Sequence, residues 1–258
     1  MLGMLGYGLM FVVDVAMAGH LGETALAASA LASNLNYIPY VFGIGVVGAI
    51  AVYQSQDNGA GVEESSPAIL RHGMVLALAL GVVTAGLTHW AARFLPLLGS
   101  SPEVTAETHD FFVIMAWAMV PGLAFHALRG HRDSQHQPWI SLAWLAVGIL
   151  ANVFFNWLWM FGNWGFPAMG LAGAGWATLV ALMIALAAYS NTFVAQYFGA
   201  REYEKCAVST MQGIWLSLLS WPVMMLLIPV LSGEGGGLGP ALLGFALTAA
   251  LVLIMVWV

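Results

Sequence analysis

The side chains best suited to chemistry in this sequence are polar groups set inside long apolar segments. Asp14 is one of twelve acidic residues and the only one placed within a long apolar run. An ionised carboxylate at the depth of the hydrocarbon costs at least about 2.5–3.5 kcal/mol on insertion scales, so such a residue usually serves an ion or a proton. Two other interpretations stay open: a carboxyl that remains protonated, and one that neighbouring helices satisfy for structural reasons.

The composition places the chain in a membrane. Of its 258 residues, 61% are hydrophobic and 7% are charged, whereas soluble domains carry about 25% charged residues. Repeated apolar runs of about 20 residues predict an all-α, polytopic helical membrane protein. A net charge of −6 does not suit nucleic acid. We expect neither an enzyme nor a cofactor, because no nucleophile–base pair or metal-ligand spacing stands out.

The apolar segments predict about eight helices. Their expected bounds are 2–19, 35–56, 68–92, 111–128, 139–161, 169–200, 207–231 and 240–258. The polar stretches 93–110 and 129–138 are predicted to be loops. The run 169–200 is longer than one membrane crossing needs.

The basic residues give an orientation. Five of the six lie at the connections that follow the second, fourth and sixth helices: Arg71, Arg129, Arg132, Arg201 and Lys205. Only Arg93 lies on the other side, so the positive-inside rule predicts a cytoplasmic N-terminus. We expect a multi-pass protein of a bacterial-type plasma membrane, that is, the inner membrane.

This orientation brings four polar side chains to one depth. Asp14 and Asn156 each lie about five residues from the outer end of a helix, and Asn152 lies one turn deeper on the same face as Asn156. Thr178 lies about nine residues inward, so all four fall roughly 7–14 Å below the outer boundary. They predict a site for Na⁺ or a proton. In the alternative, both Asn and Thr178 only hydrogen-bond neighbouring helices.

Three motifs, in order along the chain, resemble those of the multidrug and toxic compound extrusion (MATE) transporters. The first is VDVAMAGHLG at 13–22, followed by Ala27 and Ala28. The second is LRG at 128–130, followed by Asp133 and Pro138. The third and most specific joins NVFFN at 152–156 to GFPAMGLAGAGWAT at 165–178. The resemblance covers about residues 1–185.

The resemblance implies two six-helix lobes that face each other and export amphipathic, often cationic, compounds in exchange for Na⁺ or H⁺. It also implies that Asp14, Asn152 and Asn156 belong to the ion-coupling site of the first lobe, with Thr178 nearby. No other metal site is expected. Some members carry an acidic residue at the position of Asn156, so the choice between Na⁺ and H⁺ stays open.

The chain departs from the family after its sixth predicted helix. Complete members are longer, whereas here nine residues of the segment 56–87 recur in the segment 196–227 at a fixed offset of 140. Internal repeats are common in transporters. We therefore expect a six-helix lobe at 1–189 and a partial repeat of about two helices at 190–258. A single lobe would leave its polar level open to lipid, so we expect self-association or a complementary lobe.

Other residues could line a substrate cavity. Met115, Trp117 and Met119 lie inside the fourth predicted helix, and methionine and aromatic side chains suit varied apolar ligands. Packing against lipid is the alternative. Gln56 and Gln196, which correspond in the repeat, are further cavity candidates.

Three histidines sit five residues apart, at His126, His131 and His136. This spacing does not align them on a helix, so they are interpreted as surface-loop residues rather than metal ligands.

The sequence thus predicts an ion-coupled efflux antiporter for amphipathic or cationic drugs or toxic metabolites. A lipid-linked flippase of the same superfamily is an alternative within transport, although such proteins often line a cavity with several arginines. A truncated membrane fragment that does not transport is the alternative from another class.

Overall fold

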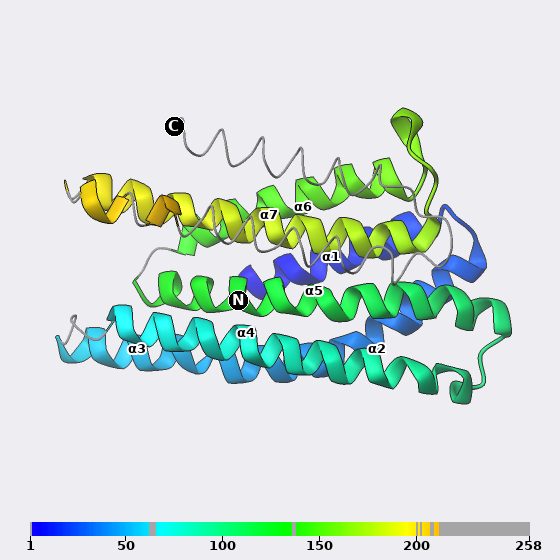
Figure 1. Ribbon diagram of the computed structural model, residues 1–258, viewed down its shortest axis with the longest axis horizontal. Coiled ribbons are helices and arrows are strands. Elements are labelled where there is room, and N and C mark those ends of the chain that lie inside the picture. Colours follow the sequence, from blue (N-terminus) through cyan, green and yellow to red (C-terminus); the bar gives the residue numbers. More distant parts are fainter. Residues whose placement is uncertain are drawn as a thin grey trace. The chain divides into compact units, whose positions relative to one another are not determined.

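The computed structural model describes residues 2–61, 66–135, 138–199, 201, 203–206 and 209–211. The chain divides into two compact units, Met1–Leu182 and Met183–Val258, which are treated separately below. Every element assigned in the described residues is helical, and long helices run alongside one another in the first unit (Figure 1).

The helices follow one another closely along the chain. Their bounds are α1 Leu2–Ala18, α2 Glu23–Val47, α3 Ala49–Ala60, α4 Ser66–Ala91, η2 Ala92–Leu98, α5 Pro102–Ser134, α6 Pro138–Trp159, η3 Asn163–Gly165 and α7 Gly170–Gly199. Five helical stretches are long and apolar enough to cross a membrane: Glu23–Ala60, Ala68–Leu98, Pro102–Ser134, Pro138–Trp159 and Gly170–Tyr189. The predicted all-α, polytopic architecture is confirmed.

Helix α5 forms the centre of the first unit. In its most apolar stretch, 83% of the residues are buried, whereas the corresponding share in the span Glu23–Ala60 is 22%. Two glycines let neighbouring helices approach it closely. A Cβ at Gly81 of α4 would lie 2.9 Å from Val120 Cα, and one at Gly43 of α2 would lie 2.8 Å from the Leu123 side chain. Such small residues at helix contacts are typical of membrane proteins.

Hydrogen bonds also join the span Glu23–Ala60, which comprises α2 and α3, to α5. Asn36 Nδ2 donates to Phe112 O at 3.3 Å, and Asn58 Nδ2 donates to Ser134 O at 3.0 Å. Both pairs are separated by 76 residues, so α2 and α3 run beside α5 in the same direction. The two hydrogen bonds therefore fix the register of α2 and α3 against α5.

The predicted starts of the second and fourth helices are wrong. Helix α2 begins at Glu23, twelve residues before the predicted start at 35. The stretch 23–34 is rich in alanine, which favours a helix even where the sequence is less apolar. Helix α5 begins at Pro102, and Ser101 caps it by accepting from Val104 N at 3.3 Å. Proline in the first turn and an acidic Glu103 both favour this start.

The stretch 129–138, predicted to be a loop, is instead helical as far as Ser134. An ion pair between Arg129 Nε and Asp133 Oδ2, 3.3 Å apart at i and i+4, lies on this extension. The polar composition predicts a break in the helix, whereas these charges lie on a helix that continues past the apolar run.

The long apolar run that begins near Met169 is one continuous helix, α7, as predicted. Helix α7 passes from the first unit into the second, because the boundary between the two units follows Leu182. The predicted helices at 207–231 and 240–258 lie almost entirely outside the described residues.

Candidate ion-coupling site

The site is built around Asp14, four residues before the end of α1. Helix α1 is apolar along its length, and its carboxylate is only 2% exposed. A buried carboxylate in an apolar helix requires hydrogen-bond donors or a cation, because burial without partners is strongly unfavourable. The donors come from α6 and α7.

Helix α6 supplies two amides. Asn152 and Asn156 lie one turn apart on the same face, and both side chains are fully buried. The chain then turns back through η3, where Gly162 and Gly165 adopt positive φ angles of 69° and 82°. Helix α7 therefore runs antiparallel to α6 (Figure 1). Thr178 of α7 returns to the level of the amides, with its Oγ1 2.9 Å from Asn152 Nδ2.

These side chains form a closed hydrogen-bond network. Asp14 Oδ1 accepts from Asn156 Nδ2 at 2.7 Å and from Asn152 Nδ2 at 3.1 Å. Asp14 Oδ2 accepts from Thr178 Oγ1 at 2.7 Å. Two further bonds join the partners to one another: Asn152 Nδ2 to Thr178 Oγ1 at 2.9 Å, and Asn156 Nδ2 to Asn152 Oδ1 at 3.2 Å. The structure thus brings all four predicted site residues together.

The prediction that the four polar side chains of the site lie open to lipid is wrong. Thr178, the most exposed of the four side chains, is only 4% exposed. The carboxylate and its three hydrogen-bond partners are therefore all buried.

One acceptor in the network has no hydrogen-bond partner among the described residues. Asn156 Oδ1 is buried and unpaired, although a buried amide oxygen normally accepts a hydrogen bond. It belongs to a site whose potential ligands are all oxygens from a carboxylate, two amides and a hydroxyl. Such hard oxygen ligands suit a hard cation, and the single carboxylate suits a proton equally.

The three cavity candidates on α5 do not share one face. At about 100° per residue, Met115 and Met119 point one way and Trp117 points nearly the opposite way. Trp117 Nε1 donates to His89 Nδ1 at 3.3 Å, so Trp117 faces α4. Met119 is buried within the protein rather than facing lipid.

The two glutamine candidates lie elsewhere. Gln56 is exposed on α3, one turn from its end. Gln196 belongs to the part of α7 in the second unit, and its side chain lies outside the described residues.

The histidines of the polar stretch lie on or beyond α5. His126 packs edge-on against Tyr40, with ring centroids 5.8 Å apart, and His131 lies 3.3 Å from Gln135 Nε2. Both belong to a helix rather than to a surface loop, and His136 lies outside the described residues. Across the described part of the chain, no three His, Cys, Asp or Glu side chains are grouped to hold a metal ion.

Sequence reasoning missed a second set of buried polar groups. Three of these side chains are at most 5% exposed: Asn36 on α2, Gln54 on α3 and Arg132 on α5. One sequence pattern could have revealed Asn36. The polar residues Ser29, Ser33 and Asn36 follow one another at helical spacing within an apolar span.

The fold and the site define a multi-pass helical membrane protein with a buried carboxylate–amide–hydroxyl centre. The MatE family model matches residues 1–158 and 161–236. The chain therefore belongs to the MatE family of transporters, as its motifs indicate. The second matched stretch includes residues 196–227, the segment that repeats 56–87.

Curated relatives carry the name NorM. The chain is 34% identical over 172 residues to the probable multidrug resistance protein NorM of Synechococcus sp., covering 67% of this chain and 37% of the relative. It is 33% identical over 203 residues to the probable multidrug resistance protein NorM of Bradyrhizobium diazoefficiens, covering 75% of this chain and 43% of the relative. The chain thus spans about two fifths of the length of these relatives.

Solved transporters share the fold. A structure described as the inward-facing conformation of a multidrug resistance MATE family transporter superposes with a TM-score of 0.60 at 14% identity, covering 95% of this chain and 76% of that chain. A MOP superfamily transporter from Pyrococcus furiosus gives the same TM-score of 0.60 at 14% identity, covering 89% and 70%. At this identity the likeness concerns the fold alone.

Proposed function

We propose that this chain acts in multidrug efflux as an antiporter unit, exchanging Na⁺ or H⁺ at Asp14 for an amphipathic or cationic compound. Family membership supports transport, since the curated relatives are named multidrug resistance proteins. The observation that carries the ion-coupling proposal is the enclosed network in which three side chains donate to one buried carboxylate.

The direction of these hydrogen bonds suggests how an ion is coupled to helix packing. Asn152, Asn156 and Thr178 all present donors to Asp14, which satisfies an ionised carboxylate. A bound Na⁺ is coordinated by oxygen atoms rather than by N–H groups. The amide side chains must therefore rotate to present their oxygens, and the hydroxyl must turn its oxygen lone pairs toward the ion. A proton on Asp14 likewise displaces one donor. Either ion therefore changes the bonds that hold α1 against α6 and α7.

Such a change biases two conformations if they differ in this packing. In the proposed cycle, ion binding favours one arrangement of α1 and release favours the other. Drug leaves from the arrangement that opens outward. Five of the six basic residues lie at the predicted cytoplasmic connections, so we place the N-terminus inside the cell, in a bacterial inner membrane.

The opposing wall of a drug cavity requires a second bundle. The first unit supplies one bundle, Met1–Leu182. We propose that this wall comes from a second copy of the chain or from a complementary lobe.

The experiment is dye efflux from vesicles that carry the full chain, with either a Na⁺ or a proton gradient imposed. Asp14→Asn keeps the size of the side chain and removes its charge. We expect wild-type efflux to follow one of the two gradients and Asp14→Asn to abolish that dependence. Coupled efflux by Asp14→Asn at the wild-type rate would overturn the proposal.

A further inference from the structure

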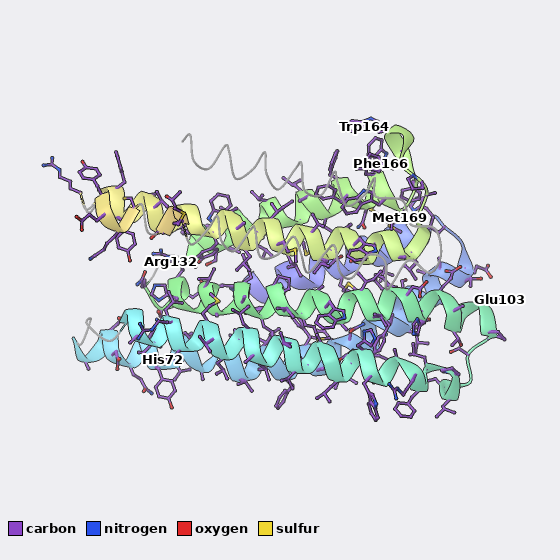
Figure 2. The ribbon with its side chains drawn as sticks, viewed as in Figure 1. His72, Glu103, Arg132, Trp164, Phe166 and Met169 are labelled. Carbon is purple, nitrogen blue, oxygen red and sulfur yellow. The ribbon has the colours of Figure 1, made fainter. Side chains whose placement is uncertain are left out.

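The close approach of α6 and α7 occurs at one glycine, Gly173. A Cβ at this position would lie 2.8 Å from Trp159 C, and 2.9 Å from both Met160 N and Trp159 O. All three are backbone atoms, which cannot rotate away as a flexible side chain would. The same turn is closed by a hydrogen bond from Met169 N to Trp159 O at 2.8 Å. Figure 2 shows Met169 at the start of α7.

The ion-coupling site lies next to this contact. Asn156 precedes Trp159 by three residues, and Thr178 follows Gly173 by five. At about 1.5 Å per residue, both side chains are roughly 5–8 Å along their helices from the glycine contact. Helices are stiff over this distance, so a change in separation at Gly173 reaches the network.

The network has little tolerance for such a change. Ordinary contact with a Cβ begins at 3.4 Å, so a methyl group at position 173 must push the two helices apart by at least about 0.5 Å. The bond from Asn152 Nδ2 to Thr178 Oγ1 is now 2.9 Å. A shift of about 0.5 Å along this bond takes it beyond the usual range for N–H···O bonds, which ends near 3.2 Å.

We propose that Gly173 is a positioning residue for the ion-coupling site. By allowing α7 to touch the backbone of α6, it sets the distance between Thr178 and the amides and thereby the affinity for the coupling ion. The inference rests on the proposed function of Asp14, and it adds a residue that touches neither the ion nor Asp14.

The test uses the purified full chain and measures the Na⁺ concentration, and separately the proton concentration, at which thermal stabilisation is half complete. The variant is Gly173→Ala. Its matched control is Gly86→Ala, because a Cβ at Gly86 of α4 meets no atom within 4 Å. We expect the control to keep the wild-type midpoint and Gly173→Ala to need at least about tenfold more of the coupling ion.

A second pair of variants protects the test against a folding failure of Gly173→Ala. Met169→Pro removes the N–H that donates to Trp159 O without adding bulk at position 173. Met169 precedes α7, which begins at Gly170, so a proline here removes no hydrogen bond from within the helix. Met169→Ala keeps the N–H and is its control. We expect Met169→Pro to raise the ion midpoint while Met169→Ala does not.

The outcomes separate the inference from the function beneath it. Wild-type ion midpoints in Gly173→Ala, or in Met169→Pro where Gly173→Ala does not fold, would overturn the positioning role and leave Asp14 as the ion site. An ion response that persists in Asp14→Asn would overturn the proposed function, and the inference would fall with it. Equal loss of stability in Gly173→Ala with and without ion, at an unchanged midpoint, would show a purely structural glycine.

Discussion

Asn156 Nδ2 and Asp14 Oδ1 are joined by a 2.7 Å hydrogen bond between residues that lie 142 positions apart in the sequence. The bond ties α1 to α6, the first and the sixth α-helices along the chain. Both side chains are buried, so water cannot replace either partner at little cost. The bond therefore helps to fix where α1 lies, and any ligand that competes for Asp14 also acts on the position of α1.

Thr178→Val should destabilise the chain without changing its shape. Valine matches threonine in size but lacks the hydroxyl that donates to Asp14 Oδ2 at 2.7 Å. A buried acceptor left without its donor costs about 1–3 kcal/mol. We expect a lower melting temperature in detergent and a weaker response to the coupling ion. Thr178→Ser keeps the hydroxyl and should lie close to wild type. Equal effects from both substitutions would show that the methyl group matters rather than the hydroxyl.

Asn156→Asp should convert the site to one that holds a proton. The new carboxyl would stand about as close to Asp14 as the present amide, at 2.7 Å, and two carboxyls at this distance share one proton. The folded variant then binds a proton that the unfolded chain releases at neutral pH. Its stability should therefore be highest in acid and fall as the pH rises.

The measurement is the melting temperature of Asn156→Asp and of wild type from about pH 5 to pH 9, at fixed salt. Asn34→Asp is a suitable control, because Asn34 is exposed and bonds only within its own helix, to Ala30 O at 2.8 Å. A pH profile of Asn156→Asp that matches the control would contradict the shared proton.

The sequence was sufficient to find the four members of the polar network. Each is a polar side chain in an apolar helix, and counting residues from the helix ends placed Asp14, Asn156 and Thr178 at similar depth. What counting could not supply is the direction of the side chains about each helix axis. That direction depends on the turn at η3 and on the approach at Gly173, which are properties of the packed structure.

The helix bounds were predicted less well, for a physical reason. Apolar windows detect the part of a helix that lies in lipid, whereas α5 extends at both ends into polar sequence. The signals for its true start were present in Ser101 and Pro102, a cap followed by proline. The buried Gln54 and Arg132 were not predicted, because a polar residue near a helix end looks like a surface residue until its neighbour is known.

Loss of Asn58 should loosen the C-terminal end of α3. Its Nδ2 donates to Ser134 O at 3.0 Å, and Ser134 Oγ donates to Gln54 Oε1 at 3.2 Å. These bonds join α3 to the end of α5. We expect Asn58→Ala to reduce the free energy of unfolding by about 1 kcal/mol.

Hydrogen exchange of α3 amides measures this effect, and faster exchange confined to α3 is the expected result. Asn34→Ala removes a bond within one helix and serves as the control. Unchanged exchange in α3 would show that packing rather than the Asn58 bond holds it against α5.

The last prediction concerns orientation. In the first unit, His72 and Arg132 lie at one end of the helices, and Glu103 and Trp164 lie at the other (Figure 2). Arg71 adjoins His72 and is exposed, as is Glu103. Cytoplasmic connections carry the excess of basic residues, so the end with Arg71 should face the cytoplasm. With Cys206, the single native cysteine, replaced by serine, a cysteine at position 103 should react with an impermeant thiol reagent in intact cells. One at position 71 should react only after the membrane is opened. Labelling at position 71 from outside, with position 103 protected, would reverse the orientation and place the Asp14 network near the cytoplasmic face.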